Sequence, residues 1–261
     1  MGDAFLTDGL APRPLPMGED AVEVSLLDLG ELGDPDFLAA RFLTVEEHEE
    51  YGRLHLPRRR REWLGARICL KTMLLRRGTV ADPLHCAVTK DSAGRPRLSL
   101  GPSATAESVY DCSLSHSRRF ACAGLSTAAD VRIGVDVEEV SPRVERLASV
   151  FARDRDVLLR PHPNDERLTI LWALKEACSK AIGRGLDLGF PDITCEETSE
   201  GRHRLTTADG PELRARHVVR EGSVVALCVL SLTRAGRPPS CAGTPATGAD
   251  RACRGSHRPA G

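Results

Sequence analysis

The sequence predicts an α+β protein of two similar subdomains related by a pseudo-two-fold axis, each a small, mostly antiparallel sheet packed on one long helix. Two segments, ending near Gly78 and Gly183, repeat apolar residues with the three-and-four spacing of a buried helix face. Short stretches of alternating apolar residues surround each of these segments. We therefore expect an N-terminal subdomain over residues 21–126 and a C-terminal subdomain over 130–234, with a cleft between them.

Composition limits the classes of protein that the chain can represent. The 261 residues carry a net charge of -1, which argues against a general nucleic-acid or membrane binder. No apolar run is long enough to span a bilayer and no signal-peptide pattern is present, so we expect a cytoplasmic protein. We also expect it to be a monomer. The nine cysteines are odd in number and form no CxxC pair, which indicates small buried hydrophobic residues rather than disulfides or zinc ligands.

The two ends of the chain differ from its middle. Residues 1–20 have no apolar period and are expected to form a flexible arm. Residues 21–29 alternate roughly and predict a first strand. Residues 235–261 consist of Gly, Pro, Ala, Ser and Arg without a period, which predicts a disordered tail.

A strand predicted over residues 131–138 carries two carboxylates on one face. Valine and isoleucine alternate with polar residues here, so Asp136 and Glu138 point the same way. Residues two apart on a strand lie roughly 6 to 7 Å apart, within reach of one cation. Ligands that offer only oxygen suit Mg²⁺, which also bridges to phosphates.

The second long helix adds a third carboxylate. Trp172, Glu176 and Lys180 are spaced by four and form one row beside its apolar face. Asn164 is the expected N-cap of this helix, and glycines follow its end. Taken alone, Glu176 and Lys180 could be an ordinary exposed pair that contributes a few tenths of a kcal/mol.

Two other polar stretches have competing interpretations. Arg53 and residues 58–61 form a basic cluster, which is either a solvated helix face or a site for anions. Ser115 and His116 lie in a loop between two predicted strands. A nucleophile and base pair is disfavoured because adjacent residues on an extended chain diverge, and contact with a phosphate is the better interpretation.

Five ordered motifs between residues 44 and 190 resemble those of one known family. Residues 134–138 (GVDVE) and 172–180 (WALKEACSK) are similar to the paired signature of the 4′-phosphopantetheinyl transferases. Residues 113–117 (SLSHS) and 94–96 (GRP) resemble that family's Ser-His loop and its Gly-basic-Pro turn. Residues 61–67 (REWLGAR) resemble a helix of the longer, surfactin-synthetase-activating type, whose fold is a pseudo-two-fold pair of α+β subdomains.

The resemblance implies a function and a set of roles. Members transfer phosphopantetheine from coenzyme A to a serine of an apo acyl or peptidyl carrier protein and release adenosine 3′,5′-bisphosphate. Such carriers serve fatty acid, polyketide or nonribosomal peptide biosynthesis. The implied Mg²⁺ ligands are Asp136, Glu138 and Glu176. The implied contacts with coenzyme A come from Arg61, Arg95, Ser115, His116, Lys175 and Lys180. Catalysis would fall to Glu176, His116 and Lys180, with the general base either Glu176 or a water that it orients.

One segment departs from the family pattern. Members often carry lysines near the coenzyme A 3′-phosphate, where this chain has Glu46, Glu47, Glu49 and Glu50. Either Arg53 or Arg58 replaces those lysines, or recognition of the 3′-phosphate is weaker. Two other functions stay open: a magnesium-dependent phosphohydrolase of nucleotide pyrophosphates, and a protein that binds carriers without catalysis.

Overall fold

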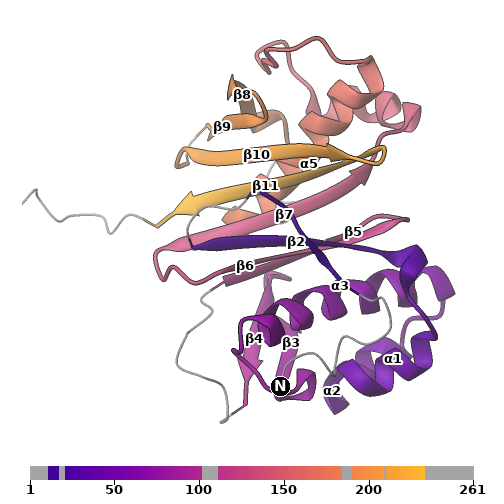
Figure 1. Ribbon diagram of the computed structural model, residues 1–261. Helices are drawn as coiled ribbons and strands as arrows, with labels where there is room; N and C mark the ends of the chain where they lie inside the picture. Colours follow the sequence, from indigo (N-terminus) through magenta and orange to yellow (C-terminus); the bar gives the residue numbers. More distant parts are fainter. Residues whose placement is uncertain (1–10, 18–20, 102–110, 184–189, 209, 233–261) are drawn as a thin grey trace, which may run out of the picture.

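Two antiparallel sheets face each other across the middle of the molecule, and a long helix covers the outer face of each (Figure 1). The computed structural model describes residues 11–17, 21–101, 111–183, 190–208 and 210–232. Mixed helix and antiparallel sheet in two similar lobes is the predicted α+β fold. None of the described helices has the length and apolar character needed to cross a membrane.

The N-terminal lobe has a sheet in the order β1-β2-β6-β5. Its strands are β1 (Arg13–Pro14), β2 (Val22–Asp28), β5 (Asp111–His116) and β6 (Phe120–Ser126). The long helix is α3 (Pro57–Arg76), and the shorter helices are α1 (Pro35–Phe42) and α2 (Val45–Gly52). A separate hairpin joins β3 (Cys86–Lys90) to β4 (Pro96–Leu100), and 3-10 turns lie at Leu29–Glu31 and Pro83–His85.

The C-terminal lobe repeats this plan with a sheet in the order β7-β11-β10-β9-β8. Its strands are β7 (Val131–Glu139), β8 (Ile193–Ser199), β9 (Arg202–Thr207), β10 (Leu213–Arg220) and β11 (Ser223–Ser231). The long helix is α5 (Asn164–Ile182), preceded by α4 (Ala148–Phe151). 3-10 turns lie at Pro142–Leu147 and Phe190–Asp192.

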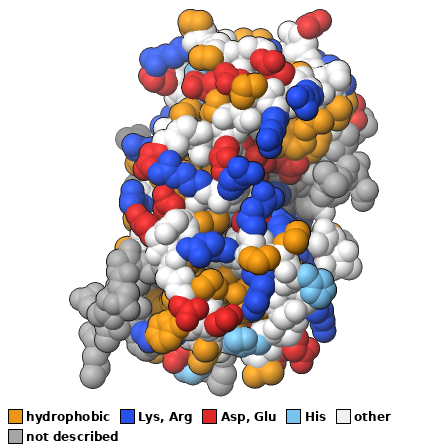
Figure 2. All heavy atoms as spheres, turned by 90° about the vertical axis from the view of Figure 1, so that its right-hand side faces the viewer, with side chains coloured by type: hydrophobic (Ala, Val, Ile, Leu, Met, Phe, Trp, Pro, Cys, Tyr) orange, Lys and Arg blue, Asp and Glu red, His pale blue; other side chains and the backbone are white. Residues whose placement is uncertain are grey.

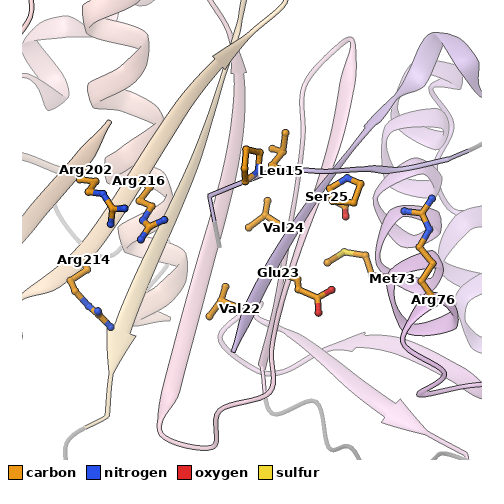
Figure 3. A pocket seen from close by; sticks show the side chains of 12 residues that line it. Leu15, Val22, Glu23, Val24, Ser25, Met73, Arg76, Arg202, Arg214 and Arg216 are labelled. Carbon is orange, nitrogen blue, oxygen red and sulfur yellow. The ribbon is translucent and has the colours of Figure 1, made fainter. Parts of the chain in front are cut away.

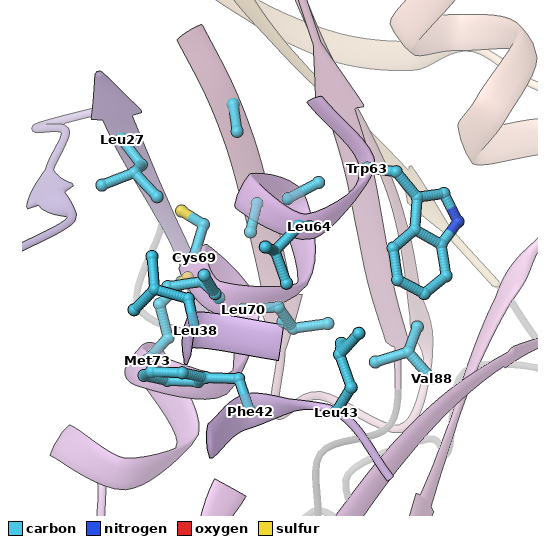
Figure 4. Close-up of a cluster of buried hydrophobic side chains, with 14 of the residues drawn as sticks. Leu27, Leu38, Phe42, Leu43, Trp63, Leu64, Cys69, Leu70, Met73 and Val88 are labelled. Carbon is cyan, nitrogen blue, oxygen red and sulfur yellow. The ribbon is translucent and has the colours of Figure 1, made fainter. Parts of the chain in front are cut away.

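Strand alternation sorts the apolar side chains into three clusters. On β6, Ala121 and Ala123 face α3, whereas Phe120 and Cys122 face the other sheet. The cluster around α3 includes Leu64, Leu70 and Phe42 and is drawn in Figure 4. A second cluster surrounds α5, and the third lies between the sheets, where residues of β2 and β6 meet residues of β7 and β11. Because a core is shared, the lobes are joined by apolar packing as well as by the chain.

Several expectations for local structure need correction. Residues 11–17 are not a free arm, because β1 pairs with β2 and Met17 is buried in the core between the sheets. Asn164 is the first residue of α5 rather than its cap, and its side chain donates to Glu145. Gly183 does end α5, with a left-handed φ of 84°. The expected tail over 235–261 lies outside the described residues.

The seven described cysteines confirm the expectation for that residue type. All of them are free and buried. Burial raises the pKa of Cys69 and of Cys86 to about 12, so these thiols stay neutral at ordinary pH. They pack as small apolar side chains.

Candidate functional site

Asp136 lies where β5, β7 and α5 meet. Its neighbour on the same face of β7 is Gly134, which packs directly against the backbone of α5: a Cβ there would overlap the carbonyl oxygen of Ala177. The absence of a side chain therefore lets the helix approach the strand closely. This contact sets the distance between the residues that α5 and β7 contribute.

The carboxylate of Asp136 is held by two donors from different elements. Ser115 Oγ of β5 donates to Asp136 Oδ1 over 2.7 Å, and Lys180 Nζ of α5 donates to the same oxygen over 2.7 Å. Lys180 also donates to Ser115 Oγ and to the carbonyl of Val135, each over 3.0 Å. Asp136 is only 3% exposed, so the ion pair with Lys180 operates where water screens it weakly.

Glu138 and Glu176 lie beside this pair. Burial raises the pKa of Glu138 to about 7, the charge of Asp136 adds to the rise, and a hydrogen bond from Trp172 Nε1 over 3.3 Å opposes it. Burial, followed by the charge of Asp136, also raises the pKa of Glu176. The three carboxylates thus repel one another, which is the electrostatic condition that a bound cation relieves.

The donor set fits a divalent cation. Asp136 Oδ2 is buried and accepts no hydrogen bond, which leaves one carboxylate oxygen available as a ligand. The chemical type of the ligands is suitable, but their positions are not those of a formed metal site: among the described residues, no three His, Cys, Asp or Glu groups stand in metal-binding geometry. Oxygen ligands on one strand and one helix suit a cation that retains waters, such as Mg²⁺.

His116 ends β5 beside this site and faces α3. Its Nε2 lies 3.4 Å from Arg59 Nη1, and its Nδ1 lies 3.6 Å from Glu62 Oε2. Burial, followed by the charge of Arg59, lowers the pKa of His116, which favours the neutral imidazole. Arg59 belongs to the basic cluster seen in the sequence, but local pattern did not distinguish it from its neighbours.

Basic side chains also gather on the surface between the lobes. Figure 2 shows Lys and Arg side chains across the middle of the face that includes this region, with Asp and Glu next to them. Arg119, after β5, donates to Asp28 over 3.2 Å and pairs with Glu221. This part of the surface therefore carries charges of both signs and is not uniformly basic.

Arg95 is placed differently from the expected contact with coenzyme A. It is 7% exposed, and Nη2 donates to both oxygens of Asp111 over 2.8 and 2.7 Å. Its Nη1 donates to the carbonyls of Lys180 and Ala181 at the end of α5. The guanidinium thus links the β3–β4 hairpin of one lobe to the long helix of the other, and in this structure it is fully occupied by protein.

Arg61 and Lys175 are also engaged within the protein. Arg61 donates to the carbonyls of Leu29 (2.8 Å) and Leu32. Lys175 has no exposed surface, and its Nζ donates to Asp156 over 2.7 Å and to a backbone carbonyl. The structure therefore brings Asp136, Glu138, Glu176, Lys180, Ser115 and His116 together, but not Arg61 or Lys175.

The acidic segment before α3 has a structural explanation. Glu47 is buried and accepts from Lys71 over 2.5 Å, while Glu50 accepts from Arg67 and Trp63 over 3.2 Å each. These carboxylates neutralise basic residues inside the lobe. Arg53 pairs with Glu49 at the surface, and Arg58 pairs with Glu62 over 3.1 Å.

Together, fold and site define a two-lobed α+β protein with an acidic site beside basic residues. A model of the 4′-phosphopantetheinyl transferase superfamily matches residues 132–228. A holo-[acyl-carrier-protein] synthase from Sulfurimonas denitrificans is 32% identical over 115 residues, which cover 40% of this chain and 85% of that relative. The chain belongs to the 4′-phosphopantetheinyl transferase superfamily.

Two further proteins are similar over part of the chain. The 4′-phosphopantetheinyl transferase psf-1 of Bacillus pumilus is 30% identical over 104 residues, 38% of this chain. The chain spans only 43% of the length of that relative. The crystal structure of Helicobacter pylori holo-[acyl-carrier-protein] synthase in complex with coenzyme A aligns with a TM-score of 0.32 and 23% identity, over 37% of this chain and 96% of that one.

Proposed function

We propose that this protein transfers the 4′-phosphopantetheine group of coenzyme A to a serine hydroxyl of an apo carrier protein. The observation that carries the proposal is the convergence of Asp136, Glu138 and Glu176 beside Lys180 and His116, in a chain of this superfamily. The serine oxygen forms a bond to the phosphorus that carries the pantetheine. The bond from that phosphorus to the bridging oxygen breaks, and adenosine 3′,5′-bisphosphate leaves.

The side chains of the site have separate tasks in this reaction. Phosphoryl-type transfer depends on positioning and charge neutralisation more than on covalent chemistry by the protein. Lys180 and Arg59 lie where they can offset charge on the phosphate oxygens, and His116 offers a ring nitrogen as a hydrogen-bond donor. Glu176 accepts the proton of the serine, directly or through a water that it orients.

A Mg²⁺ ion held by Asp136, Glu138 and Glu176 would polarise the pyrophosphate and relieve the repulsion among the carboxylates. Asp136 is held in place by Ser115 and Lys180. Trp172 orients Glu138. These contacts fix the two carboxylates that β7 contributes.

We also propose that the chain belongs to the longer, surfactin-synthetase-activating type. Two lobes with one buried lysine on each long helix support this, because the repeated plan lies within one chain. The residues that we assign to the site then come from one chain, and we propose a monomer.

Mass spectrometry of an apo carrier protein incubated with coenzyme A and Mg²⁺ tests the proposal. The expected result is a mass gain of one phosphopantetheine on the carrier, abolished by EDTA. Breakdown of coenzyme A without a carrier would instead support a phosphohydrolase. A carrier that binds and stays unmodified would support a protein without catalysis.

A further inference from the structure

Glu62 of α3 is a nearly buried carboxylate beside the proposed active site. Its side chain is 4% exposed, whereas those of Arg58, Arg59 and His116 are 61%, 50% and 26% exposed. Oε1 of Glu62 lies 3.1 Å from Arg58 Nε. Oε2 lies 3.0 Å from Arg59 Nη1 and 3.6 Å from His116 Nδ1. The carboxylate therefore lies at the base of a group of three basic side chains that reach the solvent.

Spacing along the helix does not by itself explain this arrangement. Arg58 and Arg59 precede Glu62 by four and three residues, and such pairs contribute little to stability on an exposed helix face. Glu62 is buried, however, and burying a carboxylate costs free energy that its partners offset only in part. An apolar side chain of similar volume would often stabilise the protein as well or better. The retained charge therefore points to a task other than stability.

The opposite end of α3 lacks this arrangement. There, Arg76 lines a hollow of about 840 Å³ together with Glu23 of β2, as Figure 3 shows. Glu23 pairs with Arg77, and its side chain is 47% exposed. Arg76 donates to the carbonyl of Pro12 over 2.5 Å. Of the two ends of α3, the one that faces His116 is therefore the one with a nearly buried carboxylate among its arginines.

His116 connects this group to the acidic site. Its ring is flanked by two side chains of α3, since Nε2 lies 3.4 Å from Arg59 Nη1 and Nδ1 lies 3.6 Å from Glu62 Oε2. The preceding residue on β5 holds the carboxylate of Asp136. Burial and then the charge of Arg59 lower the pKa of His116, Glu62 raises it, and Lys180 lowers it. The ring thus lies between the long helix of one lobe and the ammonium group of the other.

We propose that Glu62 is a positioning residue for the transfer reaction: it holds Arg59 and His116 together so that both face the phosphates of coenzyme A. The inference rests on the proposed function. Glu62 itself does not bind the substrate, because its oxygens are engaged with the two arginines and a carboxylate repels phosphate. Two guanidinium groups against one carboxylate leave a net positive charge, so the attraction for an anion is retained.

Orienting Arg59 in advance favours the reaction because its side chain is half-exposed. A free arginine at the surface samples many rotamers, and it loses this freedom when it binds a ligand. The ion pair with Glu62 restricts the guanidinium before the substrate arrives. Groups that are already oriented stabilise a transition state more than mobile groups of the same charge, because they need no reorganisation during the reaction.

Initial-rate kinetics of carrier modification by Glu62→Gln test this proposal. Glutamine keeps the shape of the side chain and removes its charge, so the site becomes more positive. We expect kcat to fall roughly tenfold or more, because Arg59 and His116 lose their orientation. KM for coenzyme A should stay equal or fall, since the added positive charge attracts the anionic substrate. A side chain with only a structural role would lower the melting temperature and leave kcat unchanged.

Glu50→Gln is the matched control. It removes a carboxylate from the same lobe, but Glu50 accepts from Trp63 and Arg67. The kcat of Glu50→Gln should equal that of the unmodified protein. The loss caused by Glu62→Gln should also be smaller in an Arg59→Ala background, because the two side chains act together and their effects are not additive.

Three results would overturn the proposal: an unchanged kcat in folded Glu62→Gln, an equal loss in Glu50→Gln, or a loss that is fully additive with that of Arg59→Ala. If Glu62→Gln fails to fold, Glu62→Asp replaces it, because aspartate keeps the charge and withdraws it by one methylene group. A lower kcat in Glu62→Asp supports the proposal, and an unchanged kcat contradicts it.

An NMR titration of His116 tests the contact without coenzyme A or a carrier. The pKa of His116 should be lower in Glu62→Gln than in the unmodified protein, because the carboxylate raises it. An equal pKa would place Glu62 away from the ring. Absence of transfer by the unmodified protein would refute the proposed function, whereas transfer that does not depend on Glu62 would refute this inference alone.

Discussion

The guanidinium of Arg95 donates a hydrogen bond to the backbone carbonyl of Lys180, the residue whose ammonium holds Asp136. The same guanidinium is paired with Asp111, which accepts from the backbone N–H of Ile133 on β7 over 2.7 Å. Arg95 thus contacts α5 directly and is linked to β7 through Asp111, although it lies in neither element. We interpret it as a positioning residue.

Arg95→Ala is expected to lower the free energy of unfolding by about 3–5 kcal/mol, because it leaves Asp111 buried and unpaired. It should also lower kcat of carrier modification more than it raises KM for coenzyme A, since the end of α5 loses its anchor. Urea unfolding and initial-rate kinetics measure the two effects. Arg97→Ala is the control: its pair with Asp91 is half-exposed and contributes about 0–1 kcal/mol. A raised KM with unchanged kcat would assign Arg95 to substrate binding instead.

Replacing Lys175 by methionine is expected to lower stability, whereas replacing Lys180 by methionine is expected to lower activity. Lys175→Met strands the buried Asp156 and should destabilise the protein by about 3–5 kcal/mol while KM for coenzyme A stays unchanged. Lys180→Met should reduce kcat/KM roughly 100-fold or more, because it removes a cation beside the reacting phosphate. Thermal unfolding and transfer assays on both variants make the comparison. Loss of coenzyme A affinity in Lys175→Met would restore the role that the family resemblance implied.

Asp136→Asn is expected to abolish transfer and to leave the fold intact, because asparagine preserves the shape of the side chain but not its charge. Glu176→Gln should do the same. Differential scanning fluorimetry supplies a readout apart from activity: Mg²⁺ should raise the melting temperature of the unmodified protein and not that of Asp136→Asn. An equal rise in both proteins would place the cation elsewhere.

His203 is expected to make stability depend on pH in acid. It is 3% exposed, its Nε2 lies 2.7 Å from His217 Nδ1, and burial followed by the charge of His217 lowers its pKa to about 4. An unfolded histidine titrates near 6.5, so the unfolded chain takes up the proton first as pH falls. The stability that neutral His203 contributes to the free energy of unfolding is fully present above about pH 6.5 and is lost as the pH falls toward about 4. Urea midpoints between pH 7 and 5 should fall less steeply in His203→Gln than in the unmodified protein, and parallel curves would contradict the assignment.

Local periodicity predicted how the polar residues are arranged within each of the two elements that form the acidic site. Alternation on one strand placed Asp136 and Glu138 on one face, and the spacing of four on the helix aligned Glu176 with Lys180. Both relationships join residues that are two or four positions apart, so they can be read from one sequence without knowing the fold. The close approach of strand and helix was not predicted, because it depends on Gly134 meeting Ala177 across the lobe.

The residues whose contacts differ from expectation are those with distant partners. Arg61, Arg95 and Lys175 bear long basic side chains that can reach in several directions, and their partners are 16 or more residues away. Nothing near them in sequence distinguishes a phosphate contact from a buried ion pair. The short β1 strand was missed for a related reason: two residues are too few for a period, and its stability comes from Met17 in the shared core.

Gly134 sets the distance between β7 and α5, and so limits which substitutions the acidic site tolerates. Any larger residue would push α5 away from β7, since its Cβ would overlap the carbonyl of Ala177. Glu176 and Lys180 would move with the helix, while Asp136 would stay on the sheet. Adding one methyl group at Gly134 would therefore separate Asp136 from the ammonium of Lys180. Engineering for a new acceptor is better directed at the surface loops than at this contact between strand and helix.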